Sequence, residues 1–218
     1  MEPLTSNRWE KVELAENFPK PQKGQLVRIQ TITRDNSALL HAVLNAFFTS
    51  YRTGRHNGAV IDRVELVQNF RLSLAKRLTE PIKGSSYTVY DCLSKGRYKQ
   101  LSQTIKAYEI NALYNQLLDP TFFIDDTYLE LIANEIGKNI YIVDSTNGML
   151  FVKDEEYDIF YKRERDSIVL LAFPNHFELL GVYDEKEEIV YTLFKPTNEW
   201  IQQLYSQYIQ TYNANNKK

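Results

Sequence analysis

The sequence has little cysteine, glycine, proline or histidine. Among its 218 residues there are one cysteine, Cys92, eight glycines, seven prolines and three histidines. A lone cysteine excludes an intramolecular disulfide and is typical of a reducing compartment. So few histidines and cysteines, at scattered spacings, argue against a zinc site, and we expect no metal. The scarcity of glycine and proline predicts a well-packed chain with few long linkers.

Long apolar runs and an excess of one charge are also absent. The 26 basic and 28 acidic residues give a formal net charge of −2, which predicts no general affinity for nucleic acid or membranes. No apolar run approaches the roughly 20 residues of a membrane-spanning helix, and residues 1–4 do not resemble a signal peptide. No glycine-rich phosphate loop or dinucleotide fingerprint appears, and we expect no cofactor. We therefore expect a cytoplasmic protein.

The composition itself is that of a globular domain. Hydrophobic residues make up 43% of the chain and charged residues 25%, and there are 15 tyrosines and 11 phenylalanines. These values and the chain length favour a single domain over 1–218, which we expect to be monomeric. Within it we distinguish an N-terminal extension at 1–24, a helical arm at 50–125 and a frayed tail at 213–218.

Hydrophobic spacing predicts mostly helices in the first half of the chain. Residues 26–32 alternate as a strand does, and the apolar positions that follow Ala38 have the spacing of a buried helix. A second helix is expected over 60–78, because its apolar residues gather near one face. Residues 85–124 predict shorter helices with a surface rich in tyrosine.

The second half predicts mainly strands. A helix at 128–136 would be capped by Asp126 and ended by Gly137. Four strands are then expected, the last three as an antiparallel meander, before a closing helix; the strands are 139–143, 168–173, 176–183 and 189–194, and the helix is 198–212. The fold class is α+β, with a helical lobe packed on a small, mainly antiparallel sheet.

The turn at residues 35–38 is a suitable place for a nucleophile, although Ala38 supplies none. Position 38 lies where a strand and a polar turn give way to an apolar helix. A thiol at a helix N-terminus beside a histidine has a lowered pKa. The backbone N–H groups of Asn36, Ser37 and Ala38 could also bind the oxyanion of an acyl-transfer intermediate.

A histidine and two acids could complete such a site. His176 begins an expected strand, and Glu178 follows two residues later. Residues two apart in a strand point to the same face, so the Glu178 carboxylate could orient the His176 ring. Asp35, three residues before position 38, is a second candidate for orienting the turn or the imidazole.

The chain resembles the OTU (ovarian tumour) family of deubiquitinases in three ordered blocks. Residues 35–40, Asp-Asn-Ser-Ala-Leu-Leu, are similar to the family's Asp-x-x-Cys-Leu-Phe motif, with alanine in place of cysteine. Residues 126–144 resemble the segment before the family's final strands. Residues 170–180 look like its histidine strand, in which an aromatic residue, here Phe177, follows the histidine.

This resemblance implies an OTU-like, papain-like cysteine protease fold. It implies a thiol hydrolase that removes ubiquitin, polyubiquitin or a ubiquitin-like modifier from lysine side chains, without metal or nucleotide. A cysteine at position 38 would attack the modifier's C-terminal carbonyl, and His176 would act as the base. Asn175 and Phe177 would shape the channel for the modifier's tail, and the arm at 50–125 is a candidate ubiquitin-binding region.

Ala38 is the departure from the family pattern, because alanine cannot attack a carbonyl. We interpret it as an introduced Cys-to-Ala change in an otherwise intact deubiquitinase, which leaves the chain as written inactive. The alternative is a naturally inactive ubiquitin-binding pseudoprotease. A papain-like protease with a wide cleft, acting on other peptides, is a further alternative. A compact OTU domain of this composition would suit a viral or bacterial effector in the host cytoplasm.

The remaining candidates have simpler interpretations. Cys92 lacks a strand-turn-helix context, and we expect a structural or surface thiol. His41 falls on the first helical turn after position 38, where packing is expected, and His56 lies in a glycine-flanked loop that is expected to be solvated. The charged run at 162–166 is expected to be a solvated loop, with contact to a ubiquitin surface as its alternative.

Overall fold

The computed structural model describes residues 9–32, 35–81, 83–88, 91, 109–151 and 162–215. Its main sheet has six strands in the order β1-β2-β7-β6-β5, with β8 also paired to β7. Only β5 and β6 are parallel, and the other neighbours are antiparallel. The strands are β1 (Trp9–Lys11), β2 (Gln25–Ile29), β5 (Asn139–Asp144), β6 (Ser167–Phe173), β7 (His176–Asp184) and β8 (Ile189–Tyr191).

The strands β5, β6 and β7 form the buried centre of the molecule. Their long apolar runs leave side chains buried on both faces of the sheet, as is typical of strands covered on two sides. The expected meander of β6, β7 and β8 is confirmed. The expected strand at 189–194 was wrong in its length, because the chain leaves β7 after Tyr191. Phe194 instead pairs with Ser167 at the start of β6.

The helices of the first half are α1 (Ala38–Phe47), α2 (Thr49–Thr53) and α3 (Arg63–Thr79). Most of α1 is buried, which agrees with its almost wholly apolar sequence. α3 begins later than the expected residue 60, because a small hairpin precedes it. In that hairpin β3 (Arg55–His56) pairs with β4 (Ala59–Val60), and Asp62 then caps α3 by accepting from the N–H of Val64 at 2.8 Å.

The helices of the second half are α6 (Ile110–Leu118), α7 (Leu129–Ile136) and α9 (Glu199–Asn215). A short 3-10 helix, η2 (Asp126–Tyr128), leads into α7. The expected cap at Asp126 was therefore wrong, since Asp125 accepts from the N–H of Thr127 at 2.9 Å and Asp126 is already inside the turn. Gly137 ends α7 in the left-handed conformation as expected, with φ of 64°.

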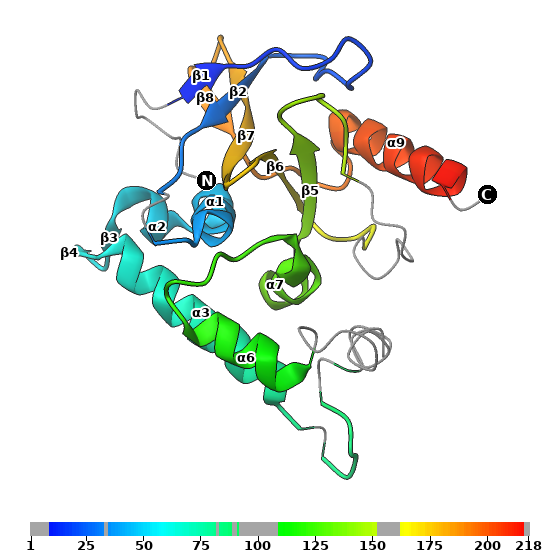
Figure 1. Cartoon of the computed structure of the whole chain (residues 1–218). Coiled ribbons are helices and arrows are strands. Elements are labelled where there is room, and N and C mark those ends of the chain that lie inside the picture. Colours follow the sequence, from blue (N-terminus) through cyan, green and yellow to red (C-terminus); the bar gives the residue numbers. More distant parts are fainter. Residues whose placement is uncertain are drawn as a thin grey trace.

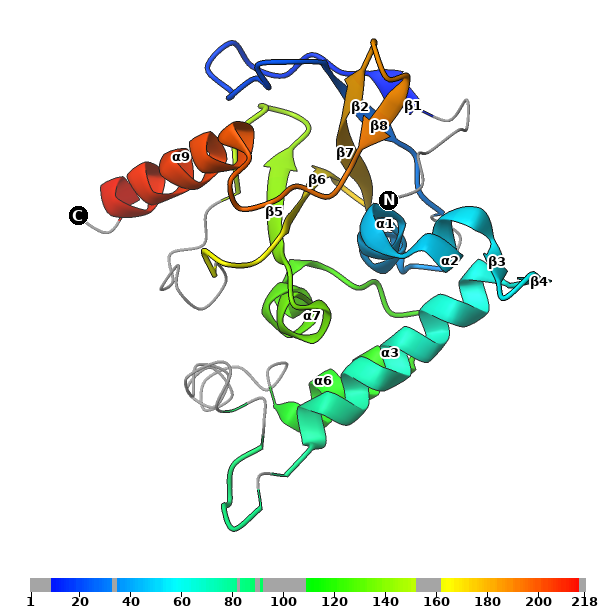
Figure 2. The same cartoon turned by 180° about the vertical axis from the view of Figure 1, so that it is seen from behind.

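The helices lie on several sides of the sheet (Figure 1). α1 and α9 lie on opposite sides of β5 and β6, and α3 and α6 pack side by side at the end remote from β1 (Figure 2). Buried residues of α1, α3, α6, α7, α9 and the sheet belong to one continuous core. The α+β class, with helices packed on a mainly antiparallel sheet, is therefore confirmed. None of the helices in the described ranges is both long and apolar enough to span a bilayer.

Candidate active site

The turn before α1 is fixed by its own polar groups. Asn36 has a φ of 56°, in the left-handed region that asparagine adopts more readily than most residues. The Asp35 Oδ1 atom accepts from the N–H of Ser37 at 3.2 Å, and the Asn36 amide donates to the carbonyl of Thr121 at 3.1 Å. The turn therefore has a defined conformation that delivers the chain into α1 at Ala38.

Ala38 is the first residue of α1 and is 1% exposed. No side chain of the described residues caps this helix. The first N–H groups of a helix have no partner within it and carry partial positive charge. Position 38 thus combines a small buried side chain with backbone donors that could face an anion.

Ser37 separates the turn from the helix, and Arg71 of α3 holds its side chain. The Arg71 Nη1 atom donates to Ser37 Oγ at 2.9 Å, although Arg71 is only 1% exposed. Its burial lowers the pKa of the guanidinium, an effect that the nearby carboxylates of Asp35 and Asp119 oppose. Sequence reasoning missed Arg71, since an arginine on a helix carries no mark of burial.

The second oxygen of Asp35 contacts a histidine, but it is not His176. Asp35 Oδ2 lies 2.8 Å from Nε2 of His41, and His41 Nδ1 lies 2.6 Å from the Tyr51 hydroxyl. The His41 side chain is wholly buried, and burial raises the pKa of Tyr51. His41 therefore packs as expected, and it also fixes Asp35.

His176 and Glu178 form the pair that the sequence predicts. Both belong to β7, and His176 Nε2 lies 3.5 Å from Glu178 Oε1. The Glu178 side chain is 7% exposed, while that of His176 is 32% exposed. The other carboxylate oxygen lies 3.7 Å from Nη1 of Arg28. The imidazole thus has a buried acid behind it and an open face, which a general base requires.

An aromatic side chain holds the ring of His176 in place. The rings of Phe173 and His176 stack at 4.4 Å between centroids and 5° between planes. The two residues are partners across the β6–β7 pair, and only Pro174 and Asn175 separate them in the chain. The short turn and the stacking together restrict the orientation of the imidazole.

Several contacts join the turn before α1 to β7, the strand of His176. The N–H of Ile124 donates to the Asn36 carbonyl at 3.0 Å, and the neighbouring Phe123 ring stacks on Phe177 at 6.3 Å. Just after β2, the Thr31 hydroxyl donates to the Phe177 carbonyl. The segment around Ile124 thus bridges the two parts of the candidate site. Within the described residues, no hydrogen bond or ion pair joins Ala38 or Asp35 directly to His176 or Glu178.

The two candidate substrate-binding residues lie at the same end of β7. Phe177 is 6% exposed and lines a cavity of about 210 Å³ together with Phe123, Phe173 and Pro174. Asn175 is exposed in the turn before His176. The cavity therefore lies at the end of the sheet where β7 begins.

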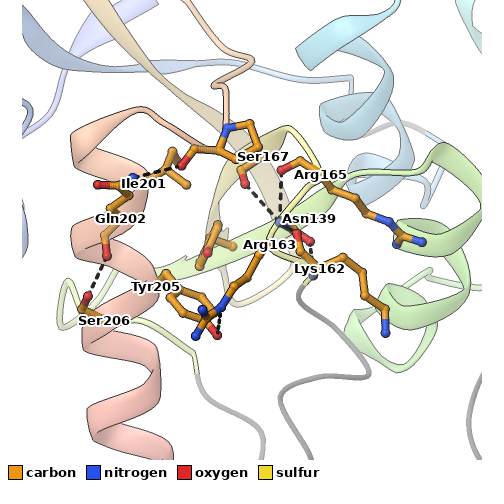
Figure 3. Close-up of a pocket in the computed structure, with 11 residues that line it drawn as sticks. Asn139, Lys162, Arg163, Arg165, Ser167, Ile201, Gln202, Tyr205 and Ser206 are labelled. Atoms are coloured by element: carbon orange, nitrogen blue, oxygen red, sulfur yellow. Dashed lines mark hydrogen bonds between the residues drawn. The ribbon is translucent and has the colours of Figure 1, made fainter.

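A second cavity lies at the opposite end of β5 and β6 (Figure 3). It has a volume of about 370 Å³, and its wall includes Lys162, Arg163 and Arg165 from the charged run at 162–166. Arg165 Nη1 donates to Asn134 Oδ1 at 3.0 Å, and the Arg163 guanidinium packs over the Tyr205 ring at 5.5 Å. The run is therefore partly packed, where a solvated loop was expected.

Two further candidates bear on the chemistry. Cys92 lies outside the described residues. Among the residues that are described, no group of three or more histidine, cysteine or acidic side chains could hold a metal ion.

Three solved structures similar to this chain are OTU domains. An OTU domain in complex with ubiquitin is 16% identical, with 86% of this chain and 90% of that one covered and a TM-score of 0.49. The OTU domain protease of Farallon virus is 15% identical, with coverage of 72% and 84% and a TM-score of 0.39. An OTU deubiquitinase from Wolbachia pipientis wMel is 11% identical, with coverage of 87% and 99% and a TM-score of 0.39. No family model and no curated protein matches the chain.

Proposed function

We propose that this chain has the framework of an OTU-type deubiquitinase whose nucleophile position holds alanine. The observation that carries the proposal is the pairing of His176 with buried Glu178, on a strand joined through residues 123–124 to the uncapped start of α1 at Ala38. The order of the three sequence blocks favours the OTU family over other thiol hydrolases. The substrate is ubiquitin or a ubiquitin-like modifier linked to a lysine, in the cytoplasm of the producing or the host cell.

With cysteine at position 38, each group has a defined role. His176 takes the thiol proton, and the Sγ atom attacks the carbonyl of the modifier's C-terminal glycine. The carbon–nitrogen bond then breaks as His176 returns the proton to the lysine amine, leaving a thioester that water hydrolyses. Glu178 orients the imidazole and stabilises its charged form.

The oxyanion of this reaction would be bound by amides of the turn and the helix start. The N–H of Ser37 already donates to Asp35, so we assign the role to the N–H groups of Asn36 and Ala38. Asp35 acts on the turn, because its carboxylate contacts Ser37 and His41. Phe177 borders the cavity that would receive the modifier's tail, and Asn175 is exposed in the turn before His176.

A ubiquitin probe with a thiol-reactive group at its C-terminus tests this function. We expect covalent labelling of Ala38→Cys and none of the chain with Ala38. Adding His176→Asn to Ala38→Cys should reduce the labelling rate by about 100-fold or more, the usual contribution of a general base. His56→Asn is the matched control, since His56 is exposed in the β3–β4 hairpin, and it should leave the rate unchanged. Absence of labelling in folded Ala38→Cys would contradict the proposal.

The alternative is a naturally inactive ubiquitin-binding protein, which Ala38 itself favours. It requires that the chain with Ala38 bind unmodified ubiquitin. Titration of ubiquitin followed by NMR measures this binding, and the labelling of Ala38→Cys then separates the two functions. A pseudoprotease binds ubiquitin but does not become labelled when Ala38 is replaced by cysteine.

A further inference from the structure

Ser37 is an N-cap residue that does not cap its helix. Serine is among the best N-cap residues, because its hydroxyl accepts from an N–H of the first turn. At Ser37, the residue before α1, the structure shows no such bond. Asp62 before α3 and Asn198 before α9 show the ordinary arrangement, with side-chain oxygens 2.8 Å and 3.1 Å from backbone N–H groups. The Ser37 hydroxyl instead contacts two other groups.

Arg71 and Asp35 account for the Ser37 hydroxyl. Its oxygen accepts from Arg71 Nη1 at 2.9 Å, and it donates to the Asp35 carbonyl at 3.2 Å. Neither contact involves an amide of α1. The hydroxyl is thus drawn away from the start of the helix.

Arg71 cannot easily release this contact, because the rest of its guanidinium is anchored. Nε donates to the Leu117 carbonyl at 2.8 Å, and Nη2 donates to the carbonyls of Gln116, at 2.9 Å, and Asp119. Nη1 also lies 3.2 Å from the carbonyl of Phe122. These carbonyls belong to the end of α6 and the loop that follows it. The buried cation therefore has one fixed position, with its Nη1 atom directed at Ser37.

We propose that Arg71 is a positioning residue that keeps the first amides of α1 free for negative charge at position 38. If Arg71 did not hold it, the Ser37 hydroxyl would cap the helix and satisfy the same N–H groups. Kept free, those amides stabilise the thiolate of a cysteine at position 38. This inference rests on the proposed function, but the stabilised thiolate is measurable without ubiquitin.

The pKa of a thiol introduced at position 38 tests the role of Arg71. The parent is Ala38→Cys with Cys92→Ser, so that one thiol remains, and ultraviolet absorbance of the thiolate is followed against pH. Arg71→Lys should decrease the thiolate fraction at neutral pH about tenfold, which is one pKa unit. Ser37→Ala should change it by less than about twofold, because no hydroxyl is then present to cap the helix.

The double variant Arg71→Lys with Ser37→Ala separates a positioning role of Arg71 from a purely structural one. Adding Ser37→Ala to Arg71→Lys should restore the thiolate fraction to within about threefold of the parent, because the competing hydroxyl is gone. A purely structural role of Arg71 predicts no such rescue. A decrease in the double variant as large as that in Arg71→Lys would overturn the proposal, as would a comparable decrease in Ser37→Ala alone.

A measurement on the chain with Ala38 applies even if Arg71→Lys does not fold. Ser37→Ala should leave the amide hydrogen exchange rates of Leu39 and Leu40 unchanged. If the hydroxyl capped α1 in solution, its loss would speed their exchange about fivefold, and the proposal would be wrong.

The two proposals can fail separately. If the thiol pKa values follow the expected pattern but the ubiquitin probe does not label Ala38→Cys, only the proposed function is contradicted. Labelling without that pattern would contradict only the role of Arg71.

Discussion

Two buried side chains behind the turn, His41 and Tyr51, extend the hydrogen bonding of Asp35 into the core. His41 lies between the Asp35 carboxylate and the Tyr51 hydroxyl, at 2.8 Å and 2.6 Å. The backbone carbonyl of Tyr51 in turn accepts from Nε of Arg63. A buried polar network of this kind stabilises one conformation only while each member keeps its partner. The conformation of the turn before Ala38 therefore depends on Tyr51, which belongs to α2.

Replacing Tyr51 with phenylalanine should change both stability and its pH dependence. At neutral pH, Tyr51→Phe should lower the free energy of unfolding by about 1–3 kcal/mol, because a buried nitrogen of His41 loses its partner. Burial raises the pKa of Tyr51 in the fold. Above the unfolded-state value of about 10, the unfolded chain releases this proton first. Stability should then fall as pH rises, by up to about 1.4 kcal/mol per pH unit, and Tyr51→Phe should lack this part of the loss.

Urea denaturation at a series of alkaline pH values measures this difference. Tyr87→Phe is the control, since Tyr87 is 49% exposed and its removal should leave the alkaline loss of stability unchanged. Equal alkaline losses in the parent chain and Tyr51→Phe would show that the Tyr51 hydroxyl ionises as readily in the fold as in the unfolded chain.

Sequence alone identified some of these residues and not others. His176 and Glu178 could be paired because strand alternation places residues two apart on one face, and the structure shows them 3.5 Å apart. The partner of Asp35 could not be chosen, since loop and helix spacing does not say which histidine a carboxylate meets. Arg71 gave no signal, because four of its five acceptor groups are backbone carbonyls, which leave no mark in a sequence.

At the scale of elements, α3 connects the candidate site to the rest of the helical arm at 50–125. Its N-terminus is fixed by Asp62, whose carboxylate accepts from the N–H of Val64. Its middle carries Arg71, which reaches the turn before α1. Its apolar face supplies Val67, Leu74 and Leu78 to the core. Removal of the Asp62 cap should therefore destabilise α3 without changing a contact of the candidate site.

Asp62→Ala should lower the free energy of unfolding by about 1 kcal/mol, the usual value for loss of an N-cap. Chemical denaturation followed by circular dichroism measures it. Asp62→Asn is the matched control, because asparagine keeps the accepting oxygen and caps about as well. If asparagine were as destabilising as alanine, the charge of Asp62 and not its hydrogen bond would be responsible.

Element types were predictable from the sequence, and some boundaries were not. The periodicities of α1, α7 and β5 to β7 follow directly from burial, so those elements appear where they were expected. The start of α3 was misplaced because Asn57 and Gly58 form a hairpin turn that hydrophobic spacing does not register. β8 ended early because Phe194 pairs with Ser167, a tertiary contact that no local pattern encodes.

At the scale of the whole molecule, the contacts join the helical arm, the sheet and both ends of the described chain. The indole N–H of Trp200 in α9 donates to the carbonyl of Pro19 at 2.8 Å. The Thr192 hydroxyl donates to the Ala46 carbonyl in α1, and Arg71 joins α3 and the end of α6 to the turn before α1. The buried apolar residues of all these elements form one cluster. Such continuity favours unfolding as one cooperative unit.

Two probes can test this cooperativity, because they report different parts of the chain. The tryptophans, Trp9 and Trp200, lie at the sheet and in α9, whereas far-ultraviolet circular dichroism is dominated by the helices, including α3 and α6. We expect the two urea transitions to coincide. Because Trp200 is 3% exposed, Trp200→Ala should cost about 3–5 kcal/mol and shift both transitions together. A dichroism transition that separates from the fluorescence, or that Trp200→Ala leaves in place, would mean that the arm at 50–125 folds independently of the sheet. The candidate site would then lie between two separate units, with its turn held from one side and its histidine from the other.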